Sequence, residues 1–160
     1  MQKVFEHISI LYVEDDILTL TALTKMLKKR VNTVYPASSG VKALELFNQH
    51  HPDIVITDIS MPGMSGLELT KEIKQQSPDT PVVIITSYTD SQNLQNALNV
   101  GADKLLCKPV QKEELFEILA YFNQLVFNAK QVRRQQSQLS QLDHIIESSL
   151  MVARYDKFGN

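Results

Sequence analysis

Cysteine is almost absent from this sequence of 160 residues, in which Cys107 is the only one. A single thiol excludes a disulfide within the chain and fits a reducing compartment. Long apolar runs are missing too, since none approaches the roughly 20 residues of a membrane-spanning helix. The first residues, MQKVFEH, lack the apolar stretch of a signal peptide. We therefore expect a cytoplasmic protein without a membrane segment.

An excess of either charge is also missing. Sixteen basic and eighteen acidic residues leave a formal net charge of -2, which gives no general attraction to nucleic acid or to an anionic membrane. We therefore expect this segment to bind neither. The hydrophobic content of 43% suffices for one well-buried domain with an appendage.

Short apolar runs are typical of buried strands here. Their apolar residues are nearly continuous, which is the pattern of parallel strands that helices cover on both faces. Four runs span 8–13, 53–58, 81–87 and 104–108, and a weaker one spans 32–37. Segments with apolar residues at helical spacing separate them. Strand and helix thus alternate five times, so we predict an α/β fold with a doubly wound parallel sheet and right-handed crossovers.

The sequence changes character after Gln111, where no further strand pattern follows and Gln, Leu and charged residues become frequent. This composition predicts one long helix. Leucine and β-branched residues recur every seven positions at Leu125, Val132, Leu139 and Ile146, and the companion positions are Asn128, Gln135, Leu142 and Ser149. Heptad spacing predicts a coiled coil over 126–150 and a parallel homodimer, in which polar seam residues fix the register at a cost in stability. The alternative is an amphipathic helix packed on its own domain.

Polar residues that could carry chemistry stand where the strand runs end. Ligand sites of open parallel sheets lie beyond the carboxyl ends of the strands. These residues are Glu14, Asp15 and Asp16, then Asp58, then Thr86 and Ser87, and finally Lys108. Carboxylates gathered at one edge repel one another unless a cation lies among them. Oxygen ligands without histidine or cysteine favour Mg²⁺.

Asp58 is the candidate nucleophile of this group. An aspartate can accept a phosphoryl group when a metal ion and a lysine, here Lys108, neutralise the transferring oxygens. Thr86 offers a hydroxyl that could bond a phosphoryl oxygen. Each residue is informative only together with the others, because Asp16 alone is equally typical of a helix N-cap.

These residues together resemble the receiver domains of bacterial two-component response regulators. The resemblance rests on Glu14-Asp15-Asp16, Asp58 with Met61-Pro62-Gly63 and Gly66, Thr86-Ser87, and Lys108-Pro109, in this order and spacing. It covers residues 7 to about 125 of the expected receiver domain, 1–125, and implies a five-stranded flavodoxin-like sheet in the order 2-1-3-4-5.

The resemblance also implies roles for individual residues. Asp58 would accept phosphate from a histidine kinase or a phosphotransfer protein, and Lys108 would contact the phosphoryl group. Asp15, Asp58 and the backbone carbonyl of Ser60 would bind Mg²⁺, with Glu14 assisting through water. Phosphorylation would switch the conformation and signal through the C-terminal helix to an output domain in the same longer chain.

Some positions depart from this pattern or modulate it. Leu105 stands three residues before Lys108, where such domains often have an aromatic switch residue coupled to the threonine. Tyr88 and Ser60 occupy positions that tune the dephosphorylation rate in the family. The segment 151–160 resembles the truncated start of a PAS sensory domain, in which a short helix leads into a strand and an Asp-x-x-Gly turn.

Two other functions stay open beside the phosphorylation switch, for which we expect no enzymatic activity beyond promoting its own phosphorylation and dephosphorylation. One is a docking or dimerisation element in which phosphorylation is marginal. The other is an aspartate-nucleophile phosphatase, because such hydrolases also use strand-end carboxylates, magnesium and lysine. Those enzymes usually carry a second Asp two residues after the nucleophile, where this chain has Ser60.

Overall fold

A computed structural model describes residues 4–87 and 91–158, without the side chains of 155–158. The chain divides into two compact units, Met1–Gln124 and Leu125–Asn160. Within the described residues, no helix combines the length and apolarity that crossing a membrane requires.

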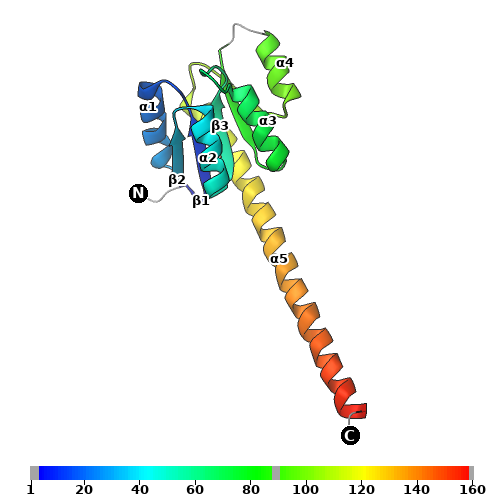
Figure 1. The fold of residues 1–160 in the computed structure, drawn as a ribbon. Coiled ribbons are helices and arrows are strands. Elements are labelled where there is room, and N and C mark those ends of the chain that lie inside the picture. The colour runs from blue at the N-terminus through cyan, green and yellow to red at the C-terminus, as the bar shows by residue number, and fades with distance from the viewer. Residues whose placement is uncertain (1–3, 88–90, 159–160) are drawn as a thin grey trace. The chain divides into compact units, whose positions relative to one another are not determined.

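Strands and helices alternate along the described residues, as Figure 1 shows. The strands are β1 (Phe5–Val13), β2 (Val31–Ala37), β3 (Ile54–Asp58), β4 (Val82–Thr86) and β5 (Lys104–Cys107). The helices are α1 (Ile17–Lys28), α2 (Gly40–His50), α3 (Gly66–Gln76), α4 (Ser91–Asn99) and α5 (Lys112–Phe158). All strand pairs are parallel, and the sheet order is β2-β1-β3-β4-β5. The predicted fold class and strand order are therefore confirmed.

Side-chain caps begin the first three helices shortly after strands or loops end. Asp16, Ser39 and Ser65 each accept a hydrogen bond from the backbone N–H three residues further on. Such N-caps satisfy amide groups that have no partner within the helix. Asp16 therefore serves the structural role that its position also allowed.

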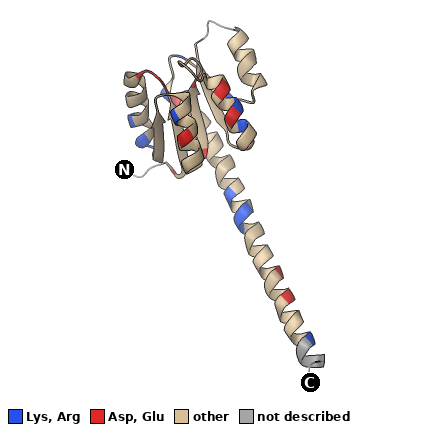
Figure 2. Cartoon of the chain, viewed as in Figure 1, with Lys and Arg blue, Asp and Glu red and all other residues tan. Residues whose placement is uncertain are grey.

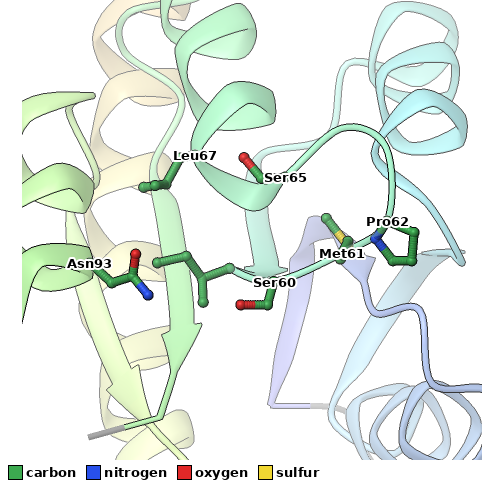
Figure 3. Close-up of a pocket in the computed structure, with 7 residues that line it drawn as sticks. Ser60, Met61, Pro62, Ser65, Leu67 and Asn93 are labelled. Atoms are coloured by element: carbon green, nitrogen blue, oxygen red, sulfur yellow. The ribbon is translucent and has the colours of Figure 1, made fainter. Parts of the chain in front are cut away.

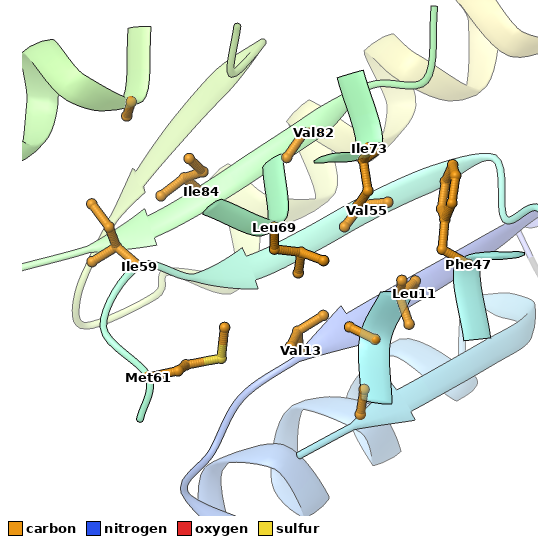
Figure 4. Packing of buried hydrophobic residues seen from close by; sticks show 13 residues of the cluster. Leu11, Val13, Phe47, Val55, Ile59, Met61, Leu69, Ile73, Val82 and Ile84 are labelled. Carbon is orange, nitrogen blue, oxygen red and sulfur yellow. The ribbon is translucent and has the colours of Figure 1, made fainter. Parts of the chain in front are cut away.

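Both faces of the sheet are buried. On one face, Phe47 of α2, Leu69 of α3 and Ala97 of α4 join Val13 and Ile84 in one hydrophobic cluster (Figure 4). Alternate strand residues point to the opposite face. They include the fully buried Ile10 and Ile56, and α1 and the first turns of α5 contribute the buried Leu27, Leu115 and Leu119. Burial on both faces explains why the strand runs are nearly continuously apolar.

An ion pair lies at the end of the sheet where the strands begin. The Lys74 amine donates to Asp103 Oδ2 at 2.7 Å and to the Thr80 carbonyl at 2.8 Å. Asp103 Oδ2 also accepts from the Val82 backbone N–H at 2.8 Å. The pair therefore connects α3 to the starts of β4 and β5, at the end of the sheet opposite the strand-end carboxylates.

The unit Leu125–Asn160 consists of the rest of α5, which is helical to Phe158. Its apolar side chains are exposed, including Val132, Leu139 and Ile146. No charged residue occurs over 135–142 (Figure 2). Helix over 151–158 differs from the helix-to-strand opening expected there, because the α-helical hydrogen bonding simply continues; assignment to a PAS domain stays a prediction.

Candidate functional site

Four charged side chains meet at the carboxyl-terminal edge of the sheet. One carboxylate oxygen each from Glu14, Asp15 and Asp58 lies within 4.8 Å of the other two. The Lys108 amine lies 3.1 Å from Asp58 Oδ2 and 4.0 Å from Glu14 Oε2. The topology causes this meeting, because β1, β3 and β5 are parallel and end at the same edge.

Asp58 is the last residue of the central strand β3 and is 4% exposed. The loop that follows returns close to the strand end, where the Gly66 N–H donates to the Ile59 carbonyl at 2.9 Å. A Cβ atom at Gly66 would lie 2.1 Å from the Asp58 carbonyl oxygen. Only glycine therefore fits this close approach. Gly63, with φ of +77°, supplies the left-handed turn of the same loop.

Glu14 is buried, and its Oε1 accepts a hydrogen bond from the Asp16 N–H at 3.1 Å. Burial raises the pKa of Glu14, and the Asp58 carboxylate raises it further, whereas the Asp16 N–H and Lys108 act in the opposite direction. Asp15 is exposed. The site thus combines the buried Glu14, whose ionisation is disfavoured, with Asp15, whose carboxylate is exposed to solvent.

Asp16 turns to α1 instead of joining the group of three carboxylates. Its Oδ2 accepts from the Thr19 hydroxyl and, at 2.9 Å, from the Thr19 backbone N–H. These two bonds lower the pKa of Asp16, the hydroxyl having the larger effect.

Lys108 follows β5 directly and is positioned through its backbone. Its N–H donates to the Thr86 carbonyl at 2.8 Å, which extends the β4–β5 pairing by one residue. The Lys108 side chain is 42% exposed. The amine can therefore reach both the buried carboxylates and a ligand that arrives from solvent.

The remaining predicted site residues lie around this group. Thr86 is buried, and its hydroxyl donates to the Ser87 carbonyl at 3.3 Å. Leu105 is half-buried and packs against the hydrophobic cluster of the α2–α4 face. Ser87 is exposed, and Tyr88 lies outside the described residues.

Ser60 is exposed in the loop after β3 and lines a pocket of about 490 Å³. Figure 3 shows it beside Met61 and Pro62, with Leu67 at the start of α3 and Asn93 of α4 at the other side. Asn93 was not identified as a site residue, because nothing in the sequence of α4 distinguishes it from a solvent-exposed amide.

Tyr12 was also overlooked. It is fully buried on β1 and lines a cavity of about 570 Å³ together with Glu14 and Lys108. The signal that could have found it is a ring with a polar tip inside the otherwise aliphatic end of the run ISILYV, because a buried tyrosine hydroxyl usually needs a hydrogen-bond partner.

The ligand atoms of the group are all carboxylate oxygens, from Glu14, Asp15 and Asp58. Hard divalent cations such as Mg²⁺ prefer oxygen ligands, and Mg²⁺ commonly takes one or two carboxylates and keeps several waters. Two buried carboxylates beside an exposed one suit this incomplete kind of coordination. The residues present therefore fit such an ion.

Similarity to known proteins covers the same region. The chain is 36% identical over 107 residues to a cyclic di-GMP phosphodiesterase of Thermotoga maritima, a match that covers 67% of this chain and 28% of that protein. It is 30% identical over 111 residues to the chemotaxis protein CheY of Halobacterium salinarum, covering 69% of this chain and 92% of that protein.

Among solved structures, the chemotaxis response regulator CheY4 of Vibrio cholerae superposes with a TM-score of 0.67 at 30% identity, covering 72% of this chain and 98% of that one. The N-terminal domain of an uncharacterized protein from Wolinella succinogenes gives a TM-score of 0.72 at 30% identity, covering 76% and 98%.

The first curated relatives are longer proteins, of which the matched region covers 25% to 40%. Residues 10–120 match the response regulator receiver domain family. With its 2-1-3-4-5 sheet and the acidic group at the carboxyl edge, the chain belongs to the receiver domains of two-component response regulators.

Proposed function

We propose that Asp58 is the phosphoacceptor of this receiver domain and takes its phosphoryl group from a histidine kinase or a phosphotransfer protein. The observation that carries the proposal is the Lys108 amine 3.1 Å from the buried Asp58 carboxylate, beside two further carboxylates. Asp58 is the one member of that group at the end of the central strand, with β1 and β4 on either side.

In the proposed transfer, an Asp58 carboxylate oxygen forms a bond to phosphorus while the bond from phosphorus to the donor nitrogen breaks. The electron pair of the broken bond stays on the donor imidazole, which then takes up a proton. Lys108 balances the negative charge on the phosphoryl oxygens as they approach the carboxylates. Hydrolysis later transfers the phosphoryl group from Asp58 to water and restores the carboxylate.

Mg²⁺ is the proposed cofactor, held by Asp15, Asp58 and the Ser60 backbone carbonyl, with Glu14 assisting through water. When bound, the ion neutralises charge that develops on the phosphoryl oxygens. Glu14 and Asp58 supply the fixed negative charge that would retain it. Burial raises the pKa of Glu14, and the neighbouring Asp58 carboxylate raises it further; a divalent cation beside these groups would favour their ionised forms.

Thr86 is the proposed sensor. Its hydroxyl now donates to the Ser87 carbonyl at a long 3.3 Å, so little is lost if it turns to a phosphoryl oxygen instead. Many receiver domains have an aromatic residue at the position of Leu105. The half-buried Leu105 side chain would therefore respond to a movement of Thr86 only through packing contacts. Ser60 and Tyr88 are proposed to tune the lifetime of the phosphorylated state.

The test is phosphorylation of the full chain by acetyl phosphate with Mg²⁺, followed by mass spectrometry. We expect the mass of one phosphoryl group to be added to the wild type and to Asp79→Asn, a control at an exposed turn aspartate, and none to Asp58→Asn. An unmodified wild type, or modification that survives in Asp58→Asn, contradicts the proposal. An unmodified wild type would instead support a docking or dimerisation module.

We propose that the signal leaves through α5 toward an output domain, with residues 1–125 as receiver, 126–150 as coiled-coil signalling helix and 151–160 as the start of a PAS domain. One similar protein is named a cyclic di-GMP phosphodiesterase and another the regulatory protein AtoC of Escherichia coli. The matched regions cover about a quarter of each, which supports an output activity outside the receiver. A cytoplasmic location fits this role.

The same proposal includes a parallel homodimer through the exposed heptad row of α5. Leu139 and Ile146 are 60% and 56% exposed, and such a row is normally covered by a partner helix. Sedimentation should give a dimer for the wild type and a monomer for Leu139→Lys, while Ser137→Lys, on another side of the helix, stays dimeric. A monomeric wild type contradicts this part alone.

A further inference from the structure

The hydroxyl of Tyr12 has no hydrogen-bond partner among the protein atoms of the described residues, although Tyr12 is fully buried. Leaving a buried hydroxyl unsatisfied is costly, and such a group in a native structure calls for a ligand, a water or a functional role. Tyr12 lies near the carboxyl end of β1, two residues before Glu14 in the sequence, and its side chain lines the same cavity as Glu14 and Lys108.

A cavity of about 570 Å³ adjoins this side chain. Most of its wall is apolar and comes from α1 and from the segment after β5, including Leu23, Met26 and Val110. Tyr12, Glu14 and Lys108 bring polar groups to the same wall. A cavity that is roomy and offers two to four polar partners is the kind of site that holds an ordered water.

The charges at this wall give the three groups complementary roles. The Tyr12 phenol is a hydrogen-bond donor. Glu14 offers acceptor oxygens. The Lys108 amine has three N–H donors, of which the hydrogen bond to Asp58 Oδ2 at 3.1 Å uses one.

We propose that Tyr12 is a positioning residue for phosphoryl transfer: after a small shift of its side chain toward the cavity, its hydroxyl joins Glu14 and Lys108, through a water, in a network that holds the lysine amine toward Asp58. The inference rests on the proposed function, because it concerns the same transfer. It explains why the Tyr12 hydroxyl is buried without a protein partner. It also explains why the Lys108 amine lies beside Asp58, although the Lys108 side chain is 42% exposed and could adopt other rotamers.

The test compares Tyr12→Phe with Tyr35→Phe, which makes the same chemical change at a half-buried ring stacked on His50. Initial rates of phosphorylation of the full chain with Mg²⁺ are measured over a range of acetyl phosphate concentrations. We expect Tyr12→Phe to lower the maximal rate roughly tenfold with little change in apparent KM, because Lys108 is misplaced during transfer and donor binding is not. Tyr35→Phe should match the wild type.

A second readout follows the Lys108 ammonium group by NMR in chains with ¹⁵N-labelled lysine, assigned with Lys108→Arg. The signal should shift in Tyr12→Phe and stay in place in Tyr35→Phe. An unchanged rate, or an unchanged signal in Tyr12→Phe, overturns the inference. If the wild type itself takes no phosphate, the proposed function fails, and the lysine signal still decides whether Tyr12 positions the amine.

Discussion

The two units of the chain use apolar residues in opposite ways. In the receiver unit, Ile56 of the central strand is fully buried, and helices cover both faces of the sheet. In the unit from Leu125 onward, Leu139 is 60% exposed on α5. The receiver therefore completes its own core, whereas the exposed row of α5 is useful only if another surface covers it. Stability should thus depend on the first unit and assembly on the second.

Truncation of one apolar side chain in each unit should have very different effects on stability. Ile56→Ala should lower the free energy of unfolding of the receiver by about 2–5 kcal/mol, because it leaves a cavity in a fully buried site. Val152→Ala, at a side chain that is 61% exposed and lies outside the heptad row, should change it by less than about 0.5 kcal/mol. Urea denaturation followed by circular dichroism at one protein concentration measures both, and equal losses would refute the division.

Two lysines near opposite strand ends of the receiver sheet should differ in their effects on stability and on function. Lys74→Ala removes bonds to Asp103 and Thr80 and should cost about 1–3 kcal/mol of stability, with phosphorylation unchanged. Lys108→Ala should instead slow phosphorylation about a hundredfold with a smaller loss of stability. Each variant is the control for the other. A Lys108 variant that is phosphorylated at the wild-type rate would show that the lysine is not needed for the transfer.

The smallest effect concerns the buried Glu14. Its folded-state pKa is raised above the ordinary value of 4.5, so the folded protein keeps this proton to a higher pH than the unfolded chain. Metal-free protein should therefore lose stability as the pH rises from about 4.5 through the raised pKa. Glu14→Gln should flatten this part of the pH profile, measured by urea denaturation with a chelator present.

Glu45→Gln is the matched control, since the Glu45 side chain is 64% exposed on α2. It should leave the slope of the profile unchanged. Wild-type and Glu14→Gln profiles that run parallel across this pH window would contradict the raised pKa of Glu14.

Fold and site differ in how far the sequence predicts them. Near-continuous apolar runs predict the five strands because both faces of the sheet are buried, and the helical spacing between them predicts the covering helices. Glu14, Asp15, Asp58 and Lys108 follow from a topological rule, because parallel strands end at one edge. The strands, the covering helices and these four site residues can therefore be predicted without any knowledge of distances.

What the sequence could not predict depends on side-chain geometry. Asp16 and Asp15 are equivalent in the sequence, and only the bond to Thr19 separates a helix cap from a member of the acidic group. Tyr12 looks like one more core residue in the sequence, and only the structure shows that its side chain lines a cavity with Glu14 and Lys108. α5 stays helical through Phe158, where a helix-to-strand opening was expected, and assignment of 151–160 to a PAS domain stays a prediction.

Titration of Mg²⁺ into the full chain, followed by ¹H–¹⁵N NMR, shows whether the acidic group binds a divalent cation. We predict saturable shifts centred on the amides around Glu14, Asp15 and Asp58, because one ion compensates the carboxylates that lie within 4.8 Å of one another. The shifts should be lost or need far more Mg²⁺ in Asp15→Asn. Signals that do not saturate, or that respond identically in wild type and Asp15→Asn, would contradict a metal-assisted phosphoacceptor at Asp58.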